Sequence, residues 1–87
     1  MTRSEVLDAA RSAVCTDRNE RYGEPEDSFG KIAAYWSTYL GITLTARQVG
    51  DMMILFKAAR LSDIGDNTDT YIDVAGYAAC AGEITNV

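Results

Sequence analysis

Residues 45–61, TARQVGDMMILFKAARL, determine the fold class of this chain of 87 residues. Thr45, followed by Gln48 three residues later, is a capping-box pattern that marks a helix start. Apolar residues then recur at helical spacing and form two adjacent faces. The first face comprises Val49, Met52, Met53, Phe56 and Ala59, and the second comprises Ile54, Leu55, Ala58 and Leu61. This stretch predicts a helix from Ala46 to about Leu61 that is buried on more than one side.

Three other segments show the same helical periodicity. One spans about residues 2–14 and opens with another capping box. The next starts at Pro25, which suits the first position of a helix, and ends at Gly41 as a C-terminal cap. The last spans about residues 69–85 and is rich in small residues that permit close helix approach. No segment alternates as a strand does, so we predict one all-α domain over residues 1–87, a compact bundle of about four helices.

Size and composition narrow the possible functions. A chain of 87 residues has little interior, and sharing a core between subunits is a common remedy, so we expect a homo-oligomer. The net charge of −5 lacks the surplus of Lys and Arg that nonspecific nucleic-acid binding requires. The absence of histidine excludes a His-based nucleophile triad. No apolar run is long enough to span a membrane, and a cytoplasmic location is expected.

The polar stretch at residues 17–29, DRNERYGEPEDSF, is the first candidate site. Arg18 and Arg21 precede a helix N-terminus, and guanidinium groups together with such a terminus suit a phosphate. Tyr22 lies among these charges and could stack on a base. The alternative is a solvated loop in which Pro25 and neighbouring acids only start a helix.

Two further clusters contain charged residues on predicted helices. Lys57 and Arg60 follow Asp51 on the central helix, where a carboxylate among apolar residues needs a partner, a metal or solvent. Asp69 and Asp73 are four residues apart and share a helix face, so with Asp51 they could hold Mg²⁺. The alternative is that Asp69 caps its helix while Asp73 pairs with Lys57 or Arg60.

Three motifs in order carry a resemblance that covers nearly the whole chain. They are RYGEPEDSF, DMMILFKAARL and DTYIDVAGYAACAGEI. The order resembles a domain of unassigned function that is widespread in bacteriophages and prophages. Its Arg-x-x-x-Tyr-Gly-x-Pro start corresponds to residues 18–25, its Lys-x-x-Arg helix to Lys57 and Arg60, and its Asp-x-x-x-Asp-x-Ala-Gly-Tyr helix to residues 69–77.

The same order is distantly similar to phage nucleotide-modification-associated domains and to all-α nucleoside triphosphate pyrophosphohydrolases of the MazG type. In those enzymes, paired acids on two helices bind Mg²⁺, which activates water. Their signature is Glu-x-x-Glu on one helix and Glu-x-x-Asp on the next. This chain departs from that signature, with Glu24-x-x-Asp27 at a helix start and Asp69-x-x-x-Asp73 later. The resemblance implies nucleotide binding, with Mg²⁺ as the cofactor if the protein is an enzyme.

The leading interpretation is a phage-type, oligomeric protein that binds a nucleotide-like ligand. Arg18, Arg21, Lys57 and Arg60 would contact phosphate and Tyr22 would stack on the base, with no catalytic residue assigned. Such a protein could sequester a signalling nucleotide of host defence in the cytoplasm of an infected or lysogenic bacterium.

Two alternatives stay open. One is a Mg²⁺-dependent, MazG-like pyrophosphohydrolase that holds the metal with Asp51, Asp69 and Asp73. The other is a non-catalytic protein-interaction module in which every charged cluster is a salt bridge and the apolar helix faces bind a partner.

Overall fold

The computed structural model describes residues 1–62 and 64–85, with Arg18 described by its backbone alone. All regular structure in this part of the chain is helical, which confirms the predicted all-α class. The elements are α1 (Arg3–Ser12), the π-helical segment η1 (Ala13–Asp17), α2 (Arg18–Tyr22), α3 (Pro25–Leu40), α4 (Ala46–Ala58) and α5 (Thr68–Glu83). No helix within the described ranges is long and apolar enough to cross a membrane.

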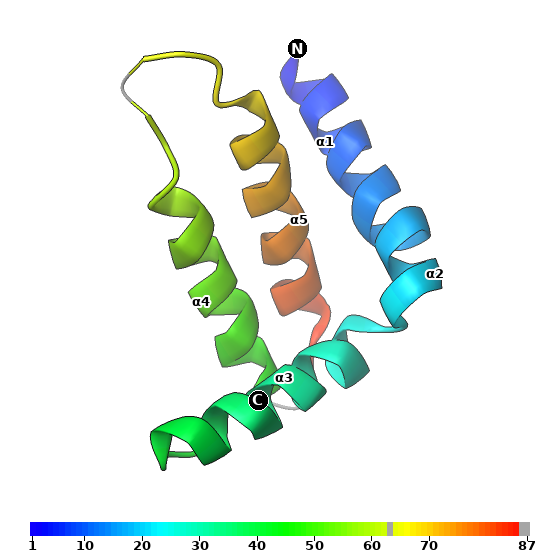
Figure 1. Ribbon diagram of the computed structural model, residues 1–87. Helices are drawn as coiled ribbons and strands as arrows, with labels where there is room; N and C mark the ends of the chain where they lie inside the picture. The colour runs from blue at the N-terminus through cyan, green and yellow to red at the C-terminus, as the bar shows by residue number, and fades with distance from the viewer. Residues whose placement is uncertain (63, 86–87) are drawn as a thin grey trace.

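Three helices lie side by side in a layer, and α3 crosses one end of that layer (Figure 1). The middle helix is α5, which contacts α4 on one flank and α1 on the other. Within the described residues α4 contacts only α5 and α3, and it does not touch α1. The layer therefore has two edge helices, α4 and α1.

The polar stretch that begins at Asp17 is helical, contrary to the prediction that the first helix stops near Val14. The chain passes from α1 through η1 into α2 without a break, because none of its residues before Gly23 strongly opposes a helix. Gly23 ends the run with a φ of 80°, and its N–H donates to the carbonyl of Asn19 at 2.9 Å. Pro25 starts α3 as predicted, so the turn between the two segments is very short.

Caps form at three of the predicted helix ends, namely the starts of α1 and α4 and the end of α3. Thr2 and Glu5 exchange hydrogen bonds of 2.8 and 3.1 Å, and the bonds from Thr2, chiefly from its backbone N–H, lower the pKa of Glu5. Thr45 and Gln48 form the same capping box at 2.9 and 3.2 Å. Gly41 ends α3 in the left-handed conformation with a φ of 72°.

Other helix boundaries differ from the prediction. The central helix ends at Ala58 rather than near Leu61. The last helix begins after a turn in which Asp66 accepts hydrogen bonds from the hydroxyl and the backbone N–H of Thr68, and both bonds lower the pKa of Asp66. Asp69 lies inside the first turn of α5, so its predicted role as the cap is wrong.

The core forms where α4 meets α5. Val49, Ile84 and Phe29 are fully buried there, with Phe29 entering from α3. Gly50 allows the two helices to approach closely, since a Cβ atom at this position would lie 2.8 Å from the Cβ of Ala81. The same Cβ would lie 3.4 Å from the ring of Phe29, so three helices meet at one glycine.

A side chain from α4 also secures the end of α5. Arg47 donates from Nε to the carbonyl of Ala81 at 3.1 Å and from its terminal nitrogen to the carbonyl of Ile84. These carbonyls have no partner within the last helical turn, and a positive charge is favourable beside them. Arg47 therefore fixes the start of α4 to the end of α5.

The apolar faces predicted for the central helix are covered only in part. Leu55 is 69% exposed, Phe56 is 47% exposed and Leu61 is 39% exposed, so burial on more than one side is wrong for the single chain. The reason is the position of α4 at the edge of the layer, where α3 and α5 cover only part of its circumference.

We expect Gly50→Ala to lower the free energy of unfolding by about 1–3 kcal/mol, because the new methyl group overlaps Ala81 and neither backbone can move freely. Urea unfolding followed by circular dichroism measures this change.

Gly30→Ala is the matched control, since a Cβ at this α3 position meets nothing within 4 Å. It should raise stability by up to about 1 kcal/mol through helix propensity. The double variant Gly50→Ala/Ala81→Gly should recover part of the loss. Equal stabilities for Gly50→Ala and Gly30→Ala would contradict the close contact.

Arg47→Lys should cost about 1–3 kcal/mol of unfolding free energy, because lysine keeps the charge but loses the planar fork that reaches two carbonyls. Arg11→Lys, at an exposed position of α1, should change stability by less than about 0.5 kcal/mol. Thermal or urea unfolding compares the two variants, and a similar small effect for both would exclude the proposed role of Arg47.

Candidate functional site

A cavity of about 810 Å³ lies between the η1–α2 segment and α5. Its volume falls within the roughly 300–1,000 Å³ of pockets that hold small organic ligands. We call it the α2–α5 pocket; its lining residues are Ala13, Val14, Asp17, Glu20, Arg21, Tyr22, Ile72, Asp73, Gly76 and Tyr77. Ten residues from two chain segments 50 or more positions apart in sequence thus form one site.

Local sequence features shape this pocket. The π-helical turn of η1 takes one residue more per hydrogen-bonded ring than an α-helix, so it sets how α2 faces α5. Gly76 allows α5 to approach η1, since a Cβ at this position would lie 2.9 Å from Cγ1 of Val14. One part of the pocket is therefore apolar and tightly packed, while polar groups are placed around it by α2 and α5.

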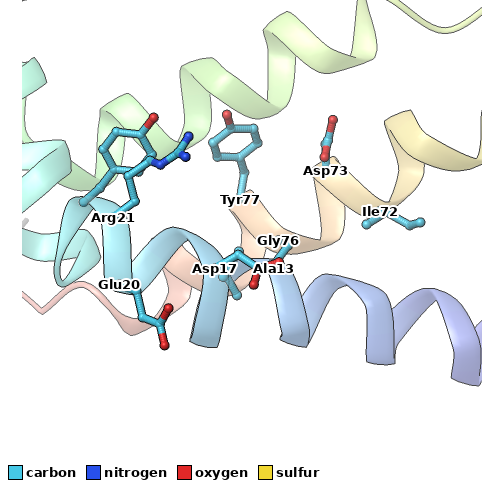
Figure 2. Close-up of a pocket in the computed structure, with 10 residues that line it drawn as sticks. Ala13, Asp17, Glu20, Arg21, Ile72, Asp73, Gly76 and Tyr77 are labelled. Carbon is cyan, nitrogen blue, oxygen red and sulfur yellow. The ribbon is translucent and has the colours of Figure 1, made fainter.

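Figure 2 shows the side chains of Arg21, Tyr77 and Asp73 pointing to the same side of the pocket, whereas Glu20 points in the opposite direction. Arg21 comes from α2, and the other two come from successive turns of α5. The Tyr77 ring also lies 6.3 Å from the buried ring of Phe29, centroid to centroid. This contact connects the pocket to the core and limits the movement of Tyr77.

Asp73 forms an ion pair with Lys57 of α4, with 2.9 Å between Oδ2 and Nζ. This pair confirms the predicted alternative in which Asp73 takes Lys57 as its partner. The Lys57 side chain is 18% exposed and that of Asp73 is 44% exposed. The lysine is thus the better buried partner, and the carboxylate remains accessible from the pocket.

The structure brings together part of the predicted phosphate-binding set. Arg21 and Tyr22 line the pocket, and Lys57 reaches its edge through Asp73. Arg60 does not line the pocket. Its guanidinium carbon instead lies 4.6 Å from the centre of the Phe56 ring on α4. The side chain of Arg18 lies outside the described part of the chain.

The predicted Mg²⁺ ligands do not meet in the single chain. Asp51 is exposed on α4, Asp69 is exposed in the first turn of α5, and Asp73 lines the pocket. Among the described residues, no three Asp, Glu or Cys side chains form a group that could hold a metal ion. Metal binding by these carboxylates stays a prediction that one chain alone does not test.

Sequence reasoning did not assign three of the polar lining residues, Tyr77, Asp17 and Glu20. Tyr77 packs against the core and also lines the pocket. Its spacing of four residues from Asp73 places both on one helix face, a signal available from sequence. Asp17 and Glu20 belong to the polar stretch that was predicted as a candidate site, but neither was assigned a role.

The fold and the pocket define a small all-α domain with a lateral ligand-sized cavity. The chain belongs to the family described as a domain of unknown function (DUF6378), whose pattern matches residues 5–85. This match and the relatives below confirm the predicted resemblance to a phage domain of unassigned function; similarity to MazG-type enzymes stays a prediction.

Two mycobacteriophage proteins are similar to the chain. It is 37% identical over 79 residues, or 91% of its length, to the gene 55 protein of Mycobacterium phage D29. It is 36% identical over 74 residues, or 84% of its length, to the gene 55 protein of Mycobacterium phage L5. These alignments cover 52% and 47% of the relatives, so the chain spans about half their length. No solved structure matches the chain.

We expect the Lys57–Asp73 pair to contribute little to stability, because one partner is nearly half exposed. A double-mutant cycle with Lys57→Met and Asp73→Asn should give a coupling energy of about 0.2–1 kcal/mol in urea unfolding. A coupling above about 2 kcal/mol would instead show that the pair strongly stabilises the packing of α4 on α5.

Proposed function

We propose that the protein binds a nucleotide-like ligand in the α2–α5 pocket and holds it without hydrolysis. The observation that supports this function is the convergence of one arginine and two tyrosines, Arg21, Tyr22 and Tyr77, on a cavity of about 810 Å³. A guanidinium group can bind phosphate oxygens in a bidentate manner, and aromatic rings can stack on any base.

The charges of the lining restrict the ligand class. Asp17 and Asp73 add carboxylates to the lining that contains the single guanidinium of Arg21, while the third acid, Glu20, points away from Arg21. Lys57 compensates only Asp73. A free triphosphate would meet strong repulsion from these carboxylates, whereas a ligand with one or two phosphate charges would meet less. We therefore propose a nucleoside monophosphate or a cyclic nucleotide, with its hydroxyl or amino groups donating to the carboxylates.

The biological role that fits such a binder is sequestration of a signalling nucleotide of host defence, in the cytoplasm of an infected or lysogenic bacterium. The relation to the gene 55 proteins of two mycobacteriophages supports the phage setting. A second candidate is Mg²⁺-dependent hydrolysis of a nucleoside triphosphate, favoured by the position of Asp73 in the same pocket as Arg21.

Equilibrium dialysis against a panel of linear and cyclic nucleotides, with and without Mg²⁺, tests the proposal. Chromatography of the free and heat-released ligand then shows whether it is intact. Mono- and cyclic nucleotides should bind without Mg²⁺ and should be recovered unchanged. Pyrophosphate release from a triphosphate that Asp73→Asn abolishes would support the enzyme instead.

Matched variants identify the site. Tyr22→Leu should weaken binding about 5–100-fold through loss of stacking, whereas Tyr71→Leu should leave it unchanged. Both tyrosines are 54% exposed, but only Tyr22 lines the pocket. Arg21→Met should weaken binding by about 10–100-fold, with Arg11→Met on α1 as its control. Equal effects of the paired variants, or no binding by any nucleotide, would overturn the proposal.

A further inference from the structure

The outer side of α4 exposes several large apolar side chains. Met52, Leu55 and Phe56 are spaced three and four residues apart, so their side chains adjoin on one face of the helix. Their exposed fractions are 36%, 69% and 47%. Gln48 and Ala59 lie on the same exposed side, which is bordered by exposed Asp51 and by Arg60, whose guanidinium lies over the Phe56 ring. We call the five residues Gln48, Met52, Leu55, Phe56 and Ala59 the α4 outer face.

The second edge helix provides an internal comparison. α1 also flanks α5 and also has an open side, as Figure 1 shows. Its exposed positions are mainly polar, and Leu7 is the large apolar side chain among them. A polar outer side is normal for a helix that faces water. The contrast indicates that α4, unlike α1, is covered by another molecule.

The total surface supports the same conclusion quantitatively. The chain exposes 6096 Å², whereas a folded monomer of its mass of 9.5 kDa exposes roughly 5,000 Å². The excess of about 1,000 Å² is close to the ~800 Å² that each partner buries in an interface of standard size. The extra surface that a single chain exposes is therefore about as large as the area that one chain buries in a protein interface.

We infer that a second copy of this chain packs on the α4 outer face and forms a two-fold dimer. A surplus of exposed area is a property of every copy of the chain, and an apolar helix edge is complementary to itself. Two chains that each carry a charge of −5 repel one another. The five residues of the α4 outer face include no acid, and a positive charge, that of Arg60, lies against its Phe56 ring. Pairing of the two edges would join the helical layers side by side.

The inferred interface is independent of the ligand pocket. The α2–α5 pocket is lined by η1, α2 and α5, and no residue of α4 contributes to its lining. The dimer should therefore form whether or not the pocket binds a nucleotide, and each hypothesis can fail without the other.

Light scattering coupled to size-exclusion chromatography tests the dimer on the full chain. At about 100 μM, where an interface of ordinary strength is saturated, the wild type should have twice the chain mass of 9.5 kDa. Leu55→Glu should have the mass of one chain with an unchanged helical circular-dichroism spectrum, because Leu55 is 69% exposed in the single chain. Leu7→Glu on α1, where Leu7 is 63% exposed, should remain dimeric.

Leu55→Ala covers the case in which Leu55→Glu does not fold. It adds no charge and should raise the dimer dissociation constant by about tenfold or more through lost apolar contact. A wild type with the mass of one chain would overturn the inference. The inference would also be overturned if Leu7→Glu dissociated the dimer and the Leu55 variants did not, because the interface would then lie on α1.

Discussion

The close contact of Gly50 with Ala81 is the constraint on which the rest of this structure depends. It brings the first part of α4 against the last turns of α5, at the place where Phe29 of α3 also packs. Phe29 in turn contacts Tyr77, so the packing of three helices reaches the edge of the α2–α5 pocket. A core with so few large side chains is possible because small residues let helix backbones, rather than bulky side chains, meet at its centre.

Much of the fold was predictable, because local chemistry determines it. The capping boxes at Thr2 and Thr45, the proline start at Pro25 and the glycine stop at Gly41 are each set by a few neighbouring residues. The continuation of the first helix through Asp17 was not predictable from charge alone, since polar residues form solvated helices as readily as loops. The exposure of Leu55 was not predictable either, because helical periodicity shows that a face is apolar and not which molecule covers it.

The candidate site was predictable by residue type more than by arrangement. Arg21, Tyr22 and Asp73 were selected from sequence and do share a cavity, although they come from distant segments. Arg60 was selected on the same grounds and stacks on Phe56 instead, because helical spacing leaves a long side chain several possible partners. The convergence of groups from different helices depends on helix packing, which single-sequence patterns specify only weakly.

The π-helical segment η1 lies between α1, which packs on α5, and α2, which presents side chains to the pocket. In a continuous α-helix the orientation of α1 would fix the orientation of α2. Val14 sets how the N-terminal helix lies against Gly76, while Arg21 and Tyr22 follow the π turn and face the cavity. Each residue of an α-helix turns the chain by about 100°, so the length of η1 determines the direction in which α2 presents its side chains. Loss or gain of one residue in this segment would leave α1 docked while rotating the arginine and the tyrosine together. Single-residue insertions and deletions in η1 would therefore change the lining of the α2–α5 pocket without a change in the core.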